Sequence, residues 1–366
     1  MREVVDLKVK IGLEVHCQLT NLKSKLFCSC SADYRQSEPN THICPVCMGV
    51  PGTLPVVNRK AVEDAVLIAL ALNMEISPRT LFYRKNYFYP DMPKNFQISQ
   101  YDKAGGIPIA KNGSMQLDGG KIVHITRLQL EEDPGKLSYE GTIETSRAAL
   151  VDYNRAGVTL AEIVTEPEMN SPREARIFLQ KLRSILEHLG VSSGELEGSM
   201  RCDANISIEG GTRVEIKNIS SFKEVERALN FEITRQRNLL RKGMRVGRET
   251  RHWDETRRIT ISLRVKEEEE DYRYFPEPDL VPVVITSEQI ESEKAAMPEL
   301  PESHKQRLMA QYGISQQNAE VLTENKALAE FFEECIKNYK RPDLLSNWLV
   351  GDLLSYLYEM DLELRE

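Results

Sequence analysis

The sequence predicts an α+β protein, with a largely antiparallel sheet and packed helices in residues 1–290 and a small all-α domain in residues 291–366. In the first part, several segments alternate apolar and polar residues, which is the period of a half-buried strand. Gly-Gly pairs between such segments predict hairpin turns. Beyond about residue 286 the alternation disappears, and short amphipathic segments follow with Asn, Ser and Pro breaks. We therefore expect the boundary between residues 286 and 298.

The first strand is predicted from the segment LKVKIGLEVHCQL, residues 7–19, in which the odd-numbered residues are apolar. Side chains alternate between the two faces of a strand, so Glu14 and His16 lie together on the polar face. A single His is usually an ordinary surface or core residue. With a carboxylate two positions away on the same face, it becomes a candidate for metal binding or proton transfer.

Four cysteines follow in the loop 28–47, as a Cys-x-Cys pair and a Cys-x-x-Cys pair separated by thirteen residues. A redox centre of the thioredoxin kind needs one such pair in a βαβ setting, and polar flanks disfavour four ordinary buried cysteines. Two short pairs suit tetrahedral Zn²⁺, with Cys28, Cys30, Cys44 and Cys47 as ligands. Four thiolates leave no open position for water, so we expect a structural site.

Composition and the N-terminal residues indicate the compartment. No apolar run approaches the roughly 18 residues that a membrane span needs. The start, MREVVDLKVK, lacks the apolar core of a secretory signal and the Arg- and Ser-rich character of a transit peptide. We therefore expect a cytoplasmic protein without membrane association, whose seven cysteines are reduced and form no structural disulfide.

Three helices and three turns are predicted in the sheet-forming part. Residues 58–73 form an Ala/Leu-rich apolar segment. Capping boxes begin helices at Ser171 and Ser221, because each Ser is followed three residues later by Glu. These helices end near Gly190 and Gly243. The hairpin turns are expected at the Gly-Gly pairs 105–106, 119–120 and 210–211.

The stretch TRLQLEEDPGK places three carboxylates in a row at the end of a predicted strand, at residues 131–133. Neighbouring side chains of a strand point to opposite faces, so only Glu131 or Glu132 can reach a given face. The three carboxylates repel each other. A bound cation would relieve that repulsion, but water and salt can do so too.

The segment SMRCDANISIEGGTRVEIKN predicts a hairpin with one polar face. A three-residue loop at 209–211 pairs Asn205 with Glu215 and Asp203 with Lys217. This face is either a solvated surface with cross-strand ion pairs or a Mg²⁺–phosphate site, and spacing alone does not decide between them. The sequence has no Walker A loop, kinase signature or dinucleotide fingerprint.

The net charge is −8, whereas a dedicated nucleic-acid binder usually has a basic excess. One basic stretch runs from Arg235 to Arg258, but it also contains acids, and its ordinary interpretation is a solvated helix end. Charge alone therefore neither proves nor excludes an RNA partner.

Taken together, the motifs resemble one family. IGLEVHCQL, RKNYFYPDMPKNFQISQYD, TRLQLEEDPGK, RCDANIS, EIKNISSF and DYRYFPEPDLVP are similar, in this order, to the B subunit of the tRNA-dependent amidotransferase. That heterotrimeric enzyme acts on misacylated glutamyl-tRNA(Gln) and aspartyl-tRNA(Asn). The resemblance runs from residue 9 to about residue 285, with weaker similarity through NWLVGDLL.

The resemblance implies a "cradle" domain with an ATP and Mg²⁺ site, Mn²⁺ being an alternative metal. There the side-chain carboxylate of the misattached Glu or Asp is phosphorylated, and ammonia displaces the phosphate. The implied partners are an amidase A subunit that makes the ammonia from glutamine, a small C subunit, misacylated tRNA and the cognate aminoacyl-tRNA synthetase. The sequence does not indicate whether Glu-tRNA or Asp-tRNA is preferred.

The resemblance also implies roles for individual residues. The catalytic positions are Glu14, His16, Glu131, Glu132, Asp203 and Glu215. Of these, all but Glu131 are expected to bind magnesium. The nucleotide- and substrate-binding positions are Lys85, Asn86, Tyr87, Asn205, Lys217 and Asn218. The zinc would act as a scaffold.

Two other functions remain open at this level. One is an ATP-dependent amide ligase for a small molecule, and the other is a non-catalytic, zinc-stabilised scaffold that binds tRNA. The chain also departs from the family pattern. Members usually continue into a tail domain that grips the tRNA, whereas this chain stops at Glu366 within an apparent helix.

Overall fold

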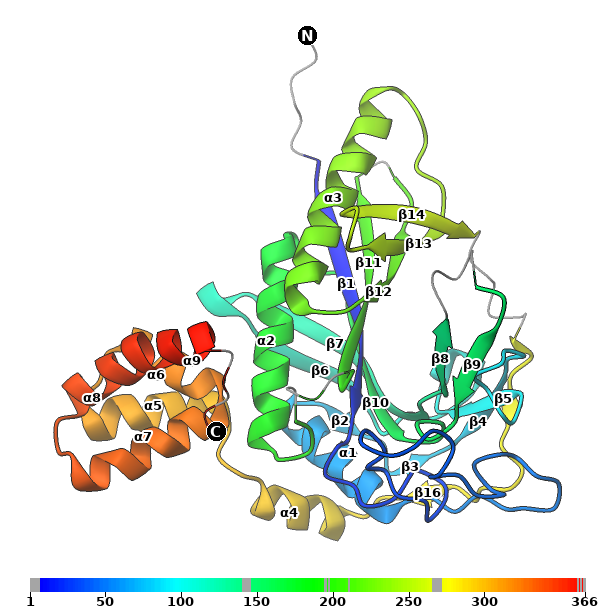
Figure 1. The fold of residues 1–366 in the computed structure, drawn as a ribbon, viewed down its shortest axis with the longest axis horizontal. Coiled ribbons are helices and arrows are strands. Elements are labelled where there is room, and N and C mark those ends of the chain that lie inside the picture. The colour runs from blue at the N-terminus through cyan, green and yellow to red at the C-terminus, as the bar shows by residue number, and fades with distance from the viewer. Residues whose placement is uncertain are drawn as a thin grey trace.

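The computed structural model describes residues 7–139, 146–193, 198–209, 211–264 and 272–360, together with residues 196, 362 and 364. Its centre is a nine-stranded sheet with the order β14-β13-β12-β11-β1-β10-β7-β6-β2 (Figure 1). Strands β12 and β13 pair in parallel, and every other pair in this sheet is antiparallel. The predicted mixed α and β content and the largely antiparallel sheet are therefore confirmed.

The strands of the large sheet are β1 (Val9–Gln18), β2 (Glu75–Ile76), β6 (Ala110–Gln116), β7 (Ile122–Glu132), β10 (Thr159–Thr165), β11 (Met200–Ile208), β12 (Val214–Ile219), β13 (Glu249–Asp254) and β14 (Ile259–Arg264). Three small sheets lie beside it. They are formed by β15 (Phe275–Pro276), β4 (Tyr83–Asn86) and β5 (Phe96–Ser99), by β16 (Val283–Val284) and β3 (Arg79–Thr80), and by β8 (Lys136–Tyr139) and β9 (Ala149–Asp152).

The helices are α1 (Arg59–Ala71), α2 (Pro172–His188), α3 (Phe222–Arg241), α4 (Ser287–Ala296), α5 (Pro301–Tyr312), α6 (Gln316–Glu324), α7 (Lys326–Asn338), α8 (Pro342–Trp348) and α9 (Leu354–Met360). A π-helical turn, Leu349–Leu353, joins the last two, and short 3₁₀ turns lie at Asp102–Ala104 and Asp118–Gly120. Among the described residues, no helix has the length and apolar character to cross a membrane.

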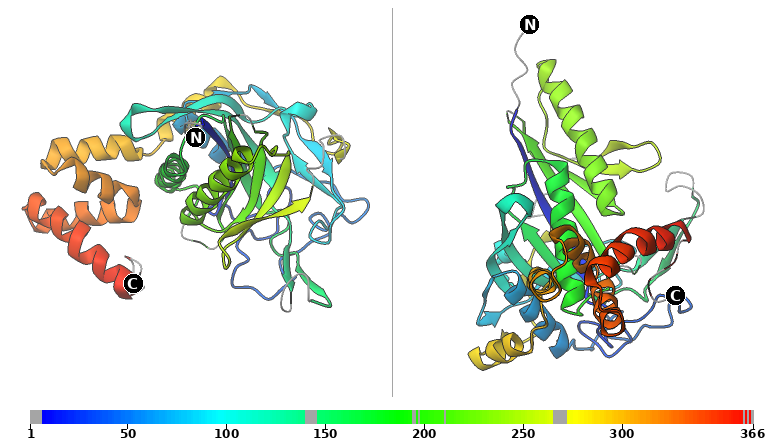
Figure 2. Two further views of the ribbon diagram at one scale, coloured as in Figure 1. Left: turned by 90° about the horizontal axis from the view of Figure 1, so that it is seen from above. Right: turned by 90° about the vertical axis from the view of Figure 1, so that its left-hand side faces the viewer.

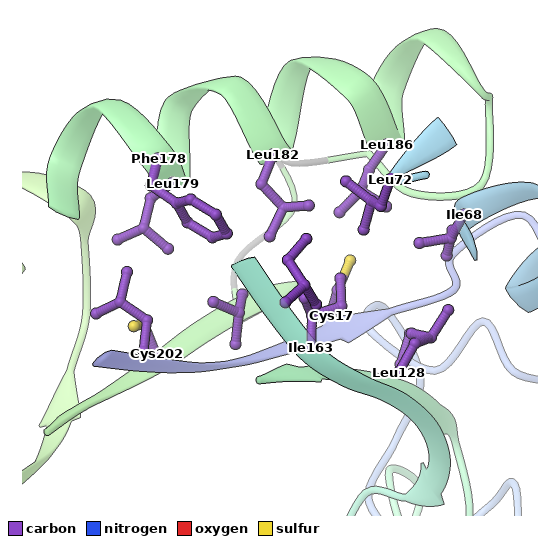
Figure 3. Packing of buried hydrophobic residues seen from close by; sticks show 14 of the residues in the cluster. Cys17, Ile68, Leu72, Leu128, Ile163, Phe178, Leu179, Leu182, Leu186 and Cys202 are labelled. Carbon is purple, nitrogen blue, oxygen red and sulfur yellow. The ribbon is translucent and has the colours of Figure 1, made fainter. Parts of the chain in front are cut away.

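One face of the large sheet forms the main hydrophobic core. The odd-numbered residues of β1 are buried there, as the alternation predicted. Figure 3 shows Phe178 and Leu182 of α2 packed over Cys17 of β1 and Ile163 of β10, with Ile68 of α1 in the same cluster. Side chains alternate between the two faces of a strand, so the even-numbered side chains of β1 point away from this core. They lie on the opposite face of the sheet, together with the other polar residues.

The predicted helices form, but only half of each capping box does. Ser171 accepts a hydrogen bond from the backbone N–H of Glu174, and Ser221 accepts one from Glu224. The return bonds are missing because both carboxylates have other partners. Glu174 accepts from the backbone N–H of Asn170, and Glu224 accepts from the indole N–H of Trp253.

Contrary to the prediction, the three Gly-Gly pairs do not all lie in hairpin turns. The pair 119–120 lies in the β6–β7 hairpin, as predicted. The pair 105–106 is not a hairpin turn, because it connects β5 of a small sheet to β6 of the large sheet. Gly211 follows β11 in the β11–β12 hairpin, whereas Gly210 lies outside the described residues.

Beyond α4 the chain is helical, and α5 to α9 lie together at one side of the molecule (Figures 1 and 2). These helices bury a second hydrophobic cluster that includes Leu308, Leu322 and Phe332. By contrast, Ile290 of α4 packs against the core of the large sheet. The division into domains 1–290 and 291–366 stays a prediction.

Candidate functional site

Polar side chains from five strands meet on the face of the large sheet that the helices leave open. The strand register aligns them across the sheet. Glu14 of β1 is opposite Asp203 of β11, and His16 of β1 is opposite Glu162 of β10. Asn205 of β11 is opposite Glu215 of β12, the pairing that the loop length predicted.

The first group, which we call cluster 1, consists of His16, Glu131 and Glu162. Each offers a ligand atom within 4.8 Å of the others, so the group has the spacing to hold a metal ion. The His16 Nε2 atom lies 3.4 Å from Glu131 Oε1 and 3.7 Å from Glu162 Oε2. The side-chain amide of Gln129 donates to Glu162 at 2.8 Å. Both carboxylates are buried, at 6% and 7% exposure.

The two carboxylates of cluster 1 differ in protonation. Burial, the neighbouring Glu162 and the hydrogen bond between the two side chains raise the pKa of Glu131 well above its ordinary value, against the opposing charge of Lys85. Burial also tends to raise the pKa of Glu162, but His16, Arg127 and Lys85 outweigh it and lower that pKa. Within this pair, Glu131 therefore binds a proton more strongly than Glu162 does.

The second group, cluster 2, consists of Glu14, Asp203 and Glu215, whose ligand atoms also lie within 4.8 Å of one another. Lys217 forms an ion pair with Asp203 and lies 3.4 Å from Glu215 Oε1. Burial alone lowers the pKa of Lys217, but these carboxylates outweigh it and raise that pKa above its ordinary value. Lys217 therefore stays charged and partly neutralises the cluster.

Asn205 is the amide of cluster 2. Its Nδ2 donates to Glu14 Oε1 at 2.9 Å. Its Oδ1 is buried, and no residue in the described ranges donates a hydrogen bond to it. A buried acceptor without a donor is costly, and a cation or a ligand donor would satisfy it. The residues of cluster 2 therefore fit a hard divalent cation, which prefers carboxylate and amide oxygens.

The sequence grouped five residues into one magnesium set, and the structure divides that set. Glu14, Asp203 and Glu215 belong to cluster 2, whereas His16 belongs to cluster 1. Glu132 joins neither, because it points to the opposite side of β7 from Glu131. It pairs with Lys94 and accepts a hydrogen bond of 3.0 Å from the backbone N–H of Ile98. On that side it lines a pocket of about 210 Å³ next to the cysteines.

Sequence reasoning missed Glu162, which completes cluster 1. The signal that could have found it is a lone carboxylate in the otherwise uncharged strand TLAEIVT. Glu162 reaches the site because β10 lies between β1 and β7 in the sheet. Arg127 of β7 was missed as well, because its approach to Glu162 also depends on the order of the strands. Its guanidinium lies 3.4 Å from the Glu162 carboxylate.

The predicted nucleotide- and substrate-binding residues are distributed unevenly. Lys85 acts on both carboxylates of cluster 1 through its charge, and its Nζ lies 4.8 Å from the centre of the Tyr272 ring. Asn205 and Lys217 are part of cluster 2. Asn86 instead donates to the backbone carbonyls of residues 272 and 273, at 3.2 and 2.7 Å.

The other two predicted substrate residues are Tyr87, directly after β4, and Asn218. The ring of Tyr87 stacks on that of Tyr89, with 5.9 Å between centroids. Asn218 lies in β12, but its side chain is outside the part of the chain that the structure describes.

The four predicted zinc ligands do come together. Cys28, Cys30, Cys44 and Cys47 place their sulfur atoms within 4.8 Å of one another. Four thiolates around Zn²⁺ lie about 3.8 Å apart, given Zn–S bonds of about 2.3 Å, so the group fits this metal. A hydrogen bond from Cys28, a backbone N–H and the charge of Lys25 lower the pKa of Cys47 to about 5, although burial opposes them. Cys47 therefore becomes a thiolate more readily than an ordinary cysteine does.

The cysteine loop is tied to the polar face through Gln18. The amide of Gln18, two positions beyond His16 on the same face, donates to Tyr34 of the loop at 3.2 Å. It also donates to the buried carboxylate of Asp133 at 2.6 Å. Arg201 donates to the same carboxylate at 2.6 Å. Order in the loop can therefore affect side chains that border cluster 1.

We expect elemental analysis to find about one zinc per chain. In a variant with Ser at all four cysteines of the cluster, this zinc should be lost and the unfolding temperature should fall, because the loop loses its cross-link. The matched control is Cys335→Ser, which changes a thiol of α7 and should keep the zinc. Metal-free parent protein with four freely titrating thiols and unchanged stability would contradict this prediction.

Comparison with known proteins covers the same segments. Residues 9–291 match the family described as the GatB/GatE catalytic domain. A protein from Sulfolobus acidocaldarius, named as the B subunit of aspartyl/glutamyl-tRNA(Asn/Gln) amidotransferase, is 56% identical over 356 residues, which cover 97% of this chain and 75% of that protein. A protein of the same name from Methanosarcina barkeri is 54% identical over 359 residues, covering 97% and 72% of the two chains. The matched region contains both carboxylate clusters and the four cysteines.

Proposed function

The chain belongs to the GatB/GatE catalytic-domain family, and we propose that it amidates misacylated Glu-tRNA(Gln), Asp-tRNA(Asn) or both at the expense of ATP. The family membership confirms the resemblance inferred from the motifs. The names of the relatives describe them as one subunit of an amidotransferase for aspartyl- and glutamyl-tRNA. We further propose an amidase A subunit and a small C subunit as partners, with the cognate aminoacyl-tRNA synthetase as a further one.

The proposed reaction has two steps. The γ-phosphoryl group of ATP is transferred to the side-chain carboxylate of the misattached residue, which gives an acyl phosphate and ADP. Ammonia then attacks the acyl carbon, the bond to the phosphate oxygen breaks, and phosphate and a proton leave. Phosphorylation is needed because a carboxylate is a poor electrophile and oxide a poor leaving group. The A subunit would release the ammonia from glutamine.

One observation carries this proposal. Two carboxylate clusters lie on one face of the sheet, and positively charged Lys and Arg side chains lie beside them. Phosphoryl transfer depends on positioning and on positive charge around the phosphate oxygens. Divalent cations at clusters 1 and 2 would supply that charge when bound. Mg²⁺ suits the oxygen ligands, and the His16 ligand makes Mn²⁺ acceptable at cluster 1.

The chain's own residues would hold and orient the reactants. Lys85 and Arg127 lie beside cluster 1, and Lys217 lies within cluster 2, so each can neutralise phosphate oxygens once the carboxylates take a cation. His16 would either bind the metal or orient Glu131 and Glu162. The zinc would hold the loop that contacts Gln18, as a scaffold rather than a reactant.

Two other functions make different predictions. A small-molecule amide ligase would hydrolyse ATP with a free amino acid in the absence of tRNA. A zinc-stabilised scaffold would bind tRNA and show no ATP hydrolysis under any conditions. The buried ionisable groups of cluster 1 favour catalysis over the scaffold, because strongly perturbed carboxylates are typical of active sites.

The complex of this chain with A and C subunits should hydrolyse ATP in the presence of Glu-tRNA(Gln) or Asp-tRNA(Asn), and should form the amide when glutamine or ammonia is added. Correctly acylated Gln-tRNA(Gln) is the control, since it has no carboxylate to phosphorylate. The measurements are phosphate release and the amino acid recovered from the tRNA. ATP hydrolysis that depends on free Glu instead of tRNA, or none at all, would overturn the proposal.

A further inference from the structure

We propose that a group of exposed cations at one end of the large sheet binds the phosphate backbone of the tRNA acceptor end and directs it toward clusters 1 and 2. This group, which we call the basic tip, consists of Arg213, Arg241, Lys242, Arg245 and Arg248. The inference rests on the proposed function, since it presumes that tRNA is the substrate.

The members of the basic tip come from two segments that the fold brings together. Arg241 ends α3, and the loop after it carries Lys242, Arg245 and Arg248 into β13. The hydroxyl of Thr212, in the β11–β12 turn, donates to the backbone carbonyl of Val246 in that loop. This bond holds the turn, with Arg213, against the loop. Figure 1 shows this end of the sheet at the top, where α3 ends.

The tip is locally basic in an acidic protein. Segments 211–213 and 237–248 contain six Arg or Lys and no Asp or Glu, whereas the whole chain has a net charge of −8. All five cations of the tip are exposed, and none forms an ion pair with another described residue. The nearest acid along the chain, Glu249, is already engaged by Arg235 and Arg251. The positive charge of the tip is therefore available to an anionic partner.

The strand register connects the tip to cluster 2. In the parallel pair β12–β13, Val214 is beside Glu249 and Glu215 is beside Thr250. Continued by one residue, this register places Arg213 beside Arg248, on the same face as Glu215. Positions two residues apart on a strand are separated by about 7 Å. Arg213, Glu215 and Lys217 thus follow one another along the polar face, and a chain of phosphates could run from the tip to the clusters.

An RNA fits this arrangement better than a protein or a membrane does. Closely spaced Arg and Lys, whose adjacent acid Glu249 is already paired with other arginines, suit repeated phosphates, which position a nucleic acid without reading its sequence. A membrane-binding surface would also need an apolar face, and Met244 is the only large apolar residue exposed in the segments 211–213 and 237–248. From the basic tip, the polar face leads along β12 to the clusters, where the aminoacyl group at the tRNA 3′ end has to react.

The test compares two triple variants in the complex with A and C subunits. The tip variant is Arg241→Ala/Lys242→Ala/Arg245→Ala. The control is Lys23→Ala/Arg79→Ala/Lys340→Ala, which removes the same charge from exposed positions at the other end of β1, in β3 and after α7. The readouts are the Kd for misacylated tRNA at several salt concentrations and the KM values for tRNA and ATP.

For the tip variant we expect weaker tRNA binding, by roughly 10-fold or more, and a salt slope of log Kd that is smaller by about 2 to 3, because three phosphate contacts are lost. The KM for ATP and the glutaminase activity should stay at the control's values. A tip variant with the control's Kd and salt slope would overturn the proposal, and so would loss of assembly with the A or C subunit, which would make the tip a protein interface. If the parent complex itself neither binds nor amidates misacylated tRNA, the proposed function fails instead. The single variant Arg245→Gln repeats the test should the triple variant fold poorly.

Discussion

Glu162→Gln is expected to abolish formation of the acyl phosphate while the complex keeps its glutaminase activity. Glutamine retains the shape of the side chain and can still accept a hydrogen bond from Gln129, but it removes the charge that the lowered pKa of Glu162 maintains. Changing a partner outside the first coordination shell of a metal typically costs about 10–100-fold in affinity or activity, so loss of a direct ligand should cost more.

The matched control for this prediction is Glu166→Gln, four residues further along the chain. Glu166 is exposed and accepts a hydrogen bond from Thr126, away from both clusters. The measurement is the phosphorylation rate at saturating misacylated tRNA, taken across a Mg²⁺ and a Mn²⁺ titration. If Glu162→Gln gave titration curves that overlay those of the parent and of Glu166→Gln, cluster 1 would be a structural network and not a metal site.

The part of this site that could be predicted from the sequence is the part that depends on local geometry. Alternation along β1 is enough to place Glu14 and His16 on one face. Loop length is enough to pair Asn205 with Glu215, a register that the structure reproduces. The cysteine spacing is equally local, and the four sulfur atoms do come together.

The part that could not be predicted depends on the order of strands in the sheet. Alternation shows that Glu131 and Glu132 face opposite ways, but only the pairing of β7 with β10 decides which of them meets His16. The same pairing brings in Glu162, which is distant in sequence from His16. Between Cys202 and Ala204 the register with β12 shifts, yet Asp203 still pairs with Lys217, as the loop length predicted.

The use that a polar side chain makes of its hydrogen-bonding groups is a second feature that the sequence does not determine. Asn86 lies in a motif that resembles a nucleotide pocket, yet its amide is occupied by two backbone carbonyls near Tyr272. A side-chain amide can satisfy the backbone or bind a ligand, and sequence alone does not distinguish these uses. The charge of Lys85, one residue earlier on the same strand, acts instead on the carboxylates of cluster 1, while its Nζ lies over the Tyr272 ring.

Asp203→Asn is expected to abolish phosphorylation as fully as Glu162→Gln, but through the other cluster. The change removes a carboxylate from cluster 2 and leaves Lys217 with Glu215 as its remaining partner among the described ion pairs. The positive charge of Lys217 is then less compensated at the position where a cation should bind. The matched control is Asp254→Asn in β13. Asp254 accepts a hydrogen bond from the backbone N–H of Arg257 and contacts neither cluster.

The two variants together test whether the clusters hold separate ions. If each cluster binds its own cation, Mn²⁺ binding measured by electron paramagnetic resonance should show two sites in the parent and one in either single variant. The double variant Glu162→Gln/Asp203→Asn should then show none, because the residues of the two clusters share no ligand. If one ion were shared between the clusters, the parent would bind one Mn²⁺ and either single change would remove it. Binding of two ions by the double variant would exclude both clusters as metal sites.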